Sequence, residues 1–131
     1  MEKILVVDDQ PEIRRLLHVS LGRFYQVIEA ADGMAALTAM HAHQPRLVLL
    51  DVMMPGTIDG LTVLDVIRSY PQTRHVAVAM LTARGQVADR EVAMARGADA
   101  YFTKPFSPLQ VLAWVREALL SKDMPQEGTP P

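Results

Sequence analysis

The sequence predicts an α/β fold built on one parallel sheet with helices packed against both of its faces. Short apolar runs alternate along the chain with segments whose apolar residues recur at intervals of three and four. The runs are continuous rather than interrupted by polar residues, which is typical of strands buried on both faces. Five strand–helix units of this kind follow one another in 131 residues. We therefore expect a five-stranded, doubly wound parallel sheet with five helices.

The strands are predicted from apolar runs bounded by turn or charged residues. The central run, Leu47–Leu50, has Arg46 before it and Asp51 at its end. A run of this kind reads as a strand in the middle of the sheet. In chain order the predicted strands are Ile4–Val7, Tyr25–Ala30, Leu47–Leu50, Val76–Leu81 and Ala100–Phe102.

The first three helices are predicted between these runs. The first begins at Pro11, a residue that suits the first helical turn. The second opens at Asp32-Gly33 and closes before Pro45, and the third stops before Pro71. Their expected apolar positions are, in order, Ile13, Leu16, Leu17, Leu21 and Phe24; Leu37 and Met40; and Leu61, Val63, Leu64 and Ile67.

The last two helices carry the clearest boundary signals. The fourth, Val87–Arg96, is followed by Gly97, which suits the C′ position after a helix. The fifth begins with Ser107 as N-cap, Pro108 in the first turn and Gln110 completing a capping box. Its expected core face consists of Leu109, Leu112, Ala113, Leu119 and Leu120. We expect one domain over residues 1–120 and a disordered tail or the start of a linker over 121–131, where prolines accumulate.

Composition narrows the class of protein. Half of the residues are hydrophobic, and a chain of this length can bury a substantial core. The net charge of -2 gives no sign of a nucleic-acid or membrane partner. The absence of cysteine excludes disulfide bonds and thiolate metal sites. No apolar run approaches the ~20 residues of a membrane span, so the simplest expectation is a cytoplasmic protein.

Polar residues stand where the predicted strands end. Asp8 and Asp9 follow the first strand, Asp51 the third, Thr82 the fourth and Lys104 the fifth. The carboxyl ends of parallel strands meet at one edge of the sheet, so these side chains should converge. Clustered carboxylates repel one another, and a hard divalent cation such as Mg²⁺ relieves that repulsion. Three carboxylates then balance one lysine and one Mg²⁺ in formal charge.

Such a site suits phosphoryl chemistry. The metal and Lys104 would take the charged oxygens of an incoming phosphoryl group, and Thr82 would donate a hydrogen bond. Asp51 as nucleophile would form an acyl phosphate. Taken singly, each residue also has an ordinary interpretation: Asp51 as a turn cap and Thr82 as a residue that favours strands.

The chain resembles the receiver domains of response regulators in bacterial two-component signalling. Four segments, in the order of that family, carry the resemblance: ILVVDD (Ile4–Asp9), LLDVMMPG with the later DG (Leu49–Gly60), MLTA (Met80–Ala83) and GADAYFTKPF (Gly97–Phe106). Each motif is weak alone, and together they are specific. The resemblance covers Lys3 to about Leu120 and implies a flavodoxin-like fold with strand order 2-1-3-4-5.

The resemblance also implies roles for the acidic residues. Asp51 would be the phosphoacceptor. A Mg²⁺ ion, for which Mn²⁺ can substitute, would be bound by Asp8, Asp9 and Asp51, with the backbone carbonyl of Met53 as a further ligand.

Other roles follow from the same resemblance. Thr82 and Lys104 would contact the phosphoryl group, and the Lys104-Pro105 peptide bond would be cis. Thr82 and Tyr101 would form a switch that couples phosphorylation to the surface. That surface would comprise the fourth helix, the fifth strand and the fifth helix, and it would control a downstream effector protein or output domain.

The expected function is a phosphorylatable switch. A sensor histidine kinase or a histidine phosphotransfer protein would supply the phosphoryl group, and the domain would catalyse its own phosphorylation and slow autodephosphorylation. Met53 and Arg84 hold the positions that tune the lifetime of the phosphorylated state in the family. Neither side chain positions an attacking water, so we expect a persistent signal.

The sequence departs from the family pattern at two places. The loop from Gly56 to Asp59 has one residue more than the family's common Pro-Gly-x-Asp-Gly. Ala100 replaces the second of two acids that many DNA-binding members use for dimerisation, and only Asp99 remains. A salt-bridged dimer of that type is therefore disfavoured.

Two further interpretations remain open from the sequence. One is a pseudo-receiver that binds protein partners without phosphate. The other is a small Mg²⁺-dependent phosphatase or a flavodoxin-like ligand-binding domain, which would need a substrate pocket, and a chain this short leaves little material for a cap.

Overall fold

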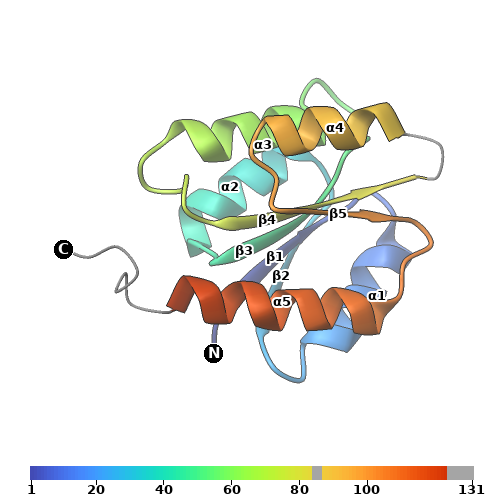
Figure 1. Ribbon diagram of the computed structural model, residues 1–131, viewed down its shortest axis with the longest axis vertical. Helices are drawn as coiled ribbons and strands as arrows, with labels where there is room; N and C mark the ends of the chain where they lie inside the picture. Colours follow the sequence, from blue (N-terminus) through green and yellow to red (C-terminus); the bar gives the residue numbers. More distant parts are fainter. Residues whose placement is uncertain (84–86, 124–131) are drawn as a thin grey trace.

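A computed structural model of the chain describes residues 1–83 and 87–123. Its centre is a five-stranded, wholly parallel sheet in the order β2-β1-β3-β4-β5, so the predicted fold and strand order are confirmed. Figure 1 shows the sheet between two layers of helices. The strands are β1 Lys3–Val7, β2 Gln26–Ala30, β3 Leu47–Asp51, β4 Ala77–Thr82 and β5 Ala100–Thr103.

The helices divide between the two faces of the sheet. In Figure 1, α1 and α5 cover one face, whereas α2, α3 and α4 cover the other. Helices α1 to α4 each connect two parallel strands and therefore run back along the sheet as crossovers. The helices are α1 Pro11–Leu21, α2 Gly33–His43, α3 Gly60–Ser69, α4 Val87–Ala95 and α5 Pro108–Asp123.

Two hydrophobic cores result from the alternation of side chains along the strands. In β3, Leu47 and Leu49 face α1 and α5, while Val48 and Leu50 face α2 and α3. All four are fully buried. Residues of a strand point alternately to opposite faces, so a strand covered on both sides must be apolar throughout.

The polar residues that were expected to begin and end helices do so. The side chain of Asp32 accepts a hydrogen bond from the Ala35 amide at 2.8 Å, and Ser107 accepts one from the Gln110 amide at 3.3 Å. Gly97 has φ of 106°, a conformation that favours glycine at C′. These contacts satisfy backbone groups that a helix end would otherwise leave unpaired.

The predicted apolar faces of α1 and α5 were partly wrong. Helix α1 ends at Leu21, so Phe24 lies beyond it, 44% exposed, with the Arg116 guanidinium 4.9 Å above its ring. In α5 the buried positions are Val111, Val115 and Leu119, a spacing of four. With this spacing, the predicted core positions Leu109, Ala113 and Leu120 of α5 face solvent. In α1, the predicted core position Leu16 is also exposed.

Helix α5 continues to Asp123, past the expected domain end at residue 120. No glycine or proline interrupts the sequence before Pro125, so nothing local ends the helix earlier. The rest of the predicted tail, 124–131, lies outside the described residues. Within residues 1–83 and 87–123, no helix is both long and apolar enough to cross a membrane.

The contact between α5 and the sheet includes an aromatic pair. The Trp114 ring meets the Phe102 ring of β5 edge-on, with centroids 6.2 Å apart. Phe102 and Trp114 belong to the core on the α1/α5 face, whereas Tyr101, the next residue along β5, packs against the opposite core. Tyr101 and Phe102, although adjacent in β5, therefore contact opposite helix layers of the molecule.

Candidate functional site

Three acidic residues lie together at the carboxyl edge of the sheet. Asp51 ends β3, and Asp8 and Asp9 follow β1, which is the neighbouring strand. One carboxylate oxygen from each of the three lies within 4.8 Å of the others. Asp8 is fully buried, Asp51 is 3% exposed and Asp9 is exposed. The parallel register therefore brings these acids to one point.

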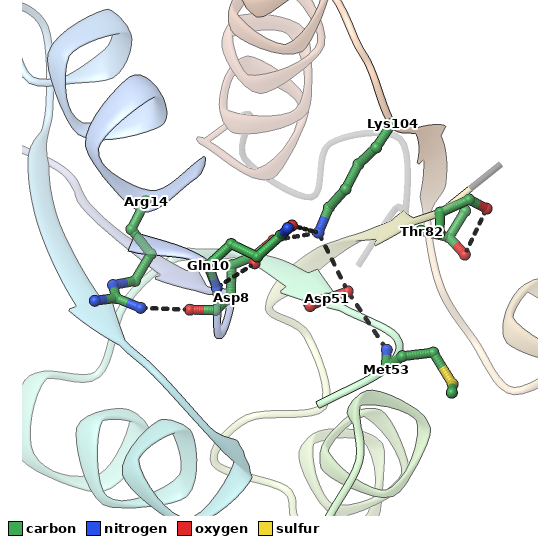
Figure 2. A network of polar contacts seen from close by, with 8 residues as sticks. Asp8, Gln10, Arg14, Asp51, Met53, Thr82 and Lys104 are labelled. Atoms are coloured by element: carbon green, nitrogen blue, oxygen red, sulfur yellow. Dashed lines mark hydrogen bonds and ion pairs between the residues drawn. The ribbon is translucent and has the colours of Figure 1, made fainter. Parts of the chain in front are cut away.

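Lys104 reaches into this acidic cluster from the end of β5. Its Nζ lies 2.7 Å from Oδ2 of Asp8 and 3.6 Å from Oδ1 of Asp51. It also donates a hydrogen bond of 3.1 Å to Oε1 of Gln10, and Figure 2 shows the side chain extended toward all three. The Lys104 amide donates to the Thr82 carbonyl at 2.6 Å, which ties the residue to β4. The Lys104-Pro105 bond is cis, the isomer that the resemblance implies.

In the described part of the chain, the one ammonium group of Lys104 faces three carboxylates, and both burial and charge act on Asp51. Burial, followed by the charge of Asp8, raises the pKa of Asp51 to about 7, while Lys104 acts in the opposite direction. The carboxyl group is therefore partly protonated near neutral pH when no other cation is present.

The cluster fits a hard divalent cation. Oδ2 of Asp8 is buried and, within the described part of the chain, accepts no hydrogen bond, although Lys104 faces it as an ion pair. A carboxylate oxygen in that state keeps the capacity to bind a metal. Asp8, Asp9 and Asp51 together offer the oxygen ligands that Mg²⁺ favours. The three acids can hold a metal ion.

Thr82 and Tyr101 are placed by β4 and β5. Thr82 is 1% exposed, pairs in register with Thr103, and its Oγ1 donates to the Ala83 carbonyl at 3.4 Å. Tyr101 pairs in register with Met80 and packs, half-buried, against the core on the α2/α3/α4 face. Their switch roles remain predictions. Arg84, which was expected to tune the phosphoryl lifetime, lies outside the described residues.

The loop after Asp51 is held by close backbone contacts. The Gly60 amide donates to the Val52 carbonyl at 2.9 Å, and a Cβ at Gly60 would lie 1.9 Å from the Asp51 carbonyl oxygen. Only glycine allows α3 to begin this close to the end of β3. Within the longer loop, Ile58 packs beside Gly33, where a Cβ would lie 2.5 Å from the Ile58 carbonyl oxygen.

Met53, the first loop residue with an exposed side chain, also contacts Asp51 through its backbone. The Met53 amide lies 3.4 Å from Oδ1 of Asp51. Its side chain is 60% exposed and, in Figure 2, extends away from that carboxylate. The proposed metal contact of its carbonyl remains a prediction.

Sequence reasoning missed two residues at this edge. The first is Gln10, which contacts Lys104. The second is Arg14, which donates a hydrogen bond from Nη1 to the Asp8 carbonyl at 2.7 Å. The Arg14 Nε and the His18 Nδ1 contact the two oxygens of Glu29, at 3.1 Å and 2.7 Å. Burial opposes ionisation of Glu29, but these two partners outweigh it and lower its pKa. The only available signal was position, because Gln10 and Arg14 begin the helix that follows the acid pair.

The pKa of Asp51 leads to a test of stability against pH. The folded value of about 7 lies above the ordinary value of 3.8, so the folded state holds an extra proton between them. The contribution of Asp51 to the free energy of unfolding is therefore greatest below about pH 4 and is lost as the pH rises through about 7. In the presence of a metal chelator, the unfolding free energy of Asp51→Asn should be about 1–3 kcal/mol larger than that of wild type at pH 7.5. At pH 4 the two should differ little.

Urea unfolding of both proteins at the two pH values measures this difference. The variant Asp65→Asn, at an exposed acid of α3, is the matched control and should show no such pH dependence. An Asp51→Asn difference that is the same at both pH values would contradict the raised pKa.

Comparison with known proteins agrees with this geometry. Residues 4–116 match the family described as response regulator receiver domain. The chain is 44% identical over 129 residues to the probable transcriptional regulator ycf27 of Cyanophora paradoxa, covering 98% of this chain and 52% of that protein. It is 43% identical over 119 residues to the alkaline phosphatase synthesis transcriptional regulatory protein PhoP of Bacillus subtilis, covering 90% of this chain and 48% of that protein.

The chain thus spans about half the length of these two relatives. Its fold is also similar to the crystal structure of the receiver domain of NtrX from Brucella abortus. That match has a TM-score of 0.83 and 35% sequence identity, and covers 88% of this chain and 97% of that one. With most of its length matched by the family, this chain belongs to the response regulator receiver domains.

Proposed function

We propose that the chain is a phosphoacceptor switch in which Asp51 accepts a phosphoryl group from a histidine kinase or a histidine phosphotransfer protein. The observation that carries the proposal is the cluster at the carboxyl edge, where buried Asp51 lies within reach of Asp8, Asp9 and Lys104. Family membership and the similarity to full-length transcriptional regulators support it.

In the transfer step, an oxygen of the Asp51 carboxylate forms a bond to phosphorus. The bond from phosphorus to the donor's imidazole nitrogen breaks, and its electron pair returns to that nitrogen. Asp8, Asp9 and Asp51 would hold Mg²⁺, which would supply positive charge to the phosphoryl oxygens. Lys104 moves from Asp8 toward the new phosphoryl group, and the Thr82 hydroxyl donates a hydrogen bond to it.

The alternative of a phosphatase with its own substrate pocket has less support. A cavity of about 810 Å³ is lined by residues that include Pro45 and Arg46, before β3, and His75 and Val76, before β4. It therefore opens at the amino-terminal edge of the sheet, away from the acidic cluster. A pseudo-receiver that works without phosphate would not need the buried, mutually repelling carboxylates.

The first test is covalent modification. With Mg²⁺ present, acetyl phosphate should add one phosphoryl group to wild type, and chelator should prevent it. Asp51→Asn keeps the shape of the side chain but removes the nucleophile, and should reduce the rate at least a hundredfold, whereas Asp65→Asn should behave as wild type. Intact mass spectrometry follows the reaction. Equal modification of Asp51→Asn and wild type would show that another residue is the acceptor.

The output would be controlled through α4, β5 and α5. Helix α4 is weakly anchored: of its side chains from 90 onward, Ala93 is buried, whereas Val92 and Met94 are 40% and 42% exposed. When Thr82 turns to the phosphoryl group, Tyr101 fills the space that it leaves, and α4 shifts. The downstream partner is an effector protein or an output domain, because the relatives named above are transcriptional regulators.

The far end of α4 is held in place, so the shift would be a pivot. Arg68 of α3 donates from Nε to the Gly97 carbonyl at 2.9 Å and from Nη1 to the Val76 carbonyl at 2.6 Å. Its Nη2 lies 3.0 Å from Asp99. These contacts fix the segment after α4, while the beginning of α4 follows the loop from Thr82. Asp99 is thus paired within the chain.

Amide hydrogen exchange tests the switch. Beryllofluoride, a mimic of the phosphoryl group, should change exchange most between Thr82 and Tyr101, because weakly packed elements open and shift most readily. Amides of α1 should change little and serve as the internal reference. If residues 82–101 exchange identically with and without the mimic, the pivot does not occur.

The lifetime of the phosphorylated state would be long. Met53 offers no strong hydrogen bond for orienting an attacking water, and its side chain points away from Asp51. The role of Arg84 in shielding the phosphoryl group is carried only by the resemblance.

The lifetime prediction is tested with Met53→Asn. Asparagine would supply a polar group that orients water, so the phosphate should be lost about two- to tenfold faster than in wild type. Met34→Asn is the matched control, since Met34 is also 60% exposed but lies in α2. Mass spectrometry after removal of acetyl phosphate gives the rates. Equal or slower loss from Met53→Asn would refute the role of this position.

A further inference from the structure

Gln10 departs from the usual chemistry of its position. It is the N-cap of α1, yet its side chain makes no capping hydrogen bond, whereas Asp32 and Asp59 cap α2 and α3. Serine, threonine, aspartate or asparagine at an N-cap would satisfy an amide of the first turn. A local rule broken next to a functional site points to another use of the side chain.

The other use is a contact with Lys104. Oε1 of Gln10 accepts a hydrogen bond of 3.1 Å from Lys104 Nζ, the same atom that lies 2.7 Å from Asp8 and 3.6 Å from Asp51. The backbone N–H of Gln10 also donates a hydrogen bond to Oδ1 of Asp8 at 2.9 Å. Gln10 thus holds both members of the closest ion pair in the acidic cluster, as Figure 2 shows.

We propose that Gln10 is a positioning residue that holds Lys104 against Asp8 in the metal-free, unphosphorylated domain and so sets the Mg²⁺ concentration that the domain requires. This inference rests on the proposed function.

The physical reason is competition between two cations. Lys104 lies within hydrogen-bond distance of Oδ2 of Asp8, and a metal bound to that oxygen would repel the ammonium group at so short a distance. Metal binding therefore moves Lys104 away from Asp8 and breaks its contact with Gln10. Any contact that exists only in the metal-free state weakens metal binding by the free energy of that contact.

The expected size is modest because Gln10 is exposed to solvent, although the Lys104 side chain is only 16% exposed. A hydrogen bond to a charged group at such a site corresponds to about a two- to tenfold change in an equilibrium constant. The simpler possibility, a surface contact that water replaces without effect, predicts no change.

The test compares Mg²⁺ binding by wild type, Gln10→Met and Gln10→Asn. Methionine keeps the length of the side chain but lacks the acceptor, and asparagine keeps an amide that is too short to reach Lys104. Both variants should bind Mg²⁺ about two- to tenfold more tightly in isothermal titration calorimetry. Gln72→Met, an exposed glutamine in the loop after α3, is the matched control and should bind as wild type does.

Two further readouts separate positioning from a structural effect. In phosphorylation by acetyl phosphate, the half-saturating Mg²⁺ concentration should fall by the same factor, while the rate at saturating Mg²⁺ stays within twofold of wild type. Gln10→Asn should also raise the thermal midpoint, since asparagine is a good N-cap. Tighter Mg²⁺ binding in both variants supports the proposal, since only Gln10→Asn adds a helix cap.

Unchanged Mg²⁺ affinity in both variants would overturn the proposal, as would a change in Gln10→Asn alone. A lower rate at saturating Mg²⁺ would also overturn it, because Gln10 would then act on the transfer itself. Calorimetry requires no phosphorylation, so a failure of Asp51 to accept a phosphoryl group would count against the proposed function and leave this test intact.

Discussion

A single ammonium group facing two buried carboxylates is the interaction on which the rest of the structure depends. Lys104 lies between Asp8 and Asp51 and is positioned by the end of β5, while the acids are positioned by β1 and β3. Its charge offsets only part of theirs. Burial, followed by the charge of Asp8, raises the pKa of Asp51 to about 7. A domain selected for stability alone would place apolar residues here. Within residues 1–83 and 87–123, the carboxylates thus outnumber the cation that faces them.

The remaining features of the edge hold that arrangement in place. Gly60 lets α3 begin against the backbone of Asp51, and Arg14 fixes the carbonyl of Asp8 from the other side. The sheet between them is apolar on both faces, so its strand ends have little freedom to rearrange. The carboxylates cannot relax apart, and their repulsion remains available to favour the binding of a cation.

The sequence was informative where one local rule decides the outcome. The apolar run of β3, bounded by charged residues, favours a strand covered on both faces, and parallel strands bring Asp8, Asp51 and Lys104 to the same edge. It was less informative where the outcome depends on the angle of a helix against the sheet. Leu109 fits a helical period as well as Val111 does, and only the packing of α5 selects Val111. Gln10 and Lys104 are 94 residues apart in the sequence, so no local pattern predicts the hydrogen bond between them.

The aromatic pair of β5 and α5 has a spectroscopic consequence. Trp114 is the only tryptophan in the chain, and it contacts Phe102 on the face of the sheet away from α2, α3 and α4. The fluorescence emission of Trp114 therefore depends on the position of Phe102, the residue of β5 adjacent to Tyr101. A rotation of Tyr101 confined to its own side would leave the fluorescence unchanged, whereas a displacement of the strand would alter it. The native chromophore can thus distinguish a side-chain switch from a backbone switch in unlabelled protein.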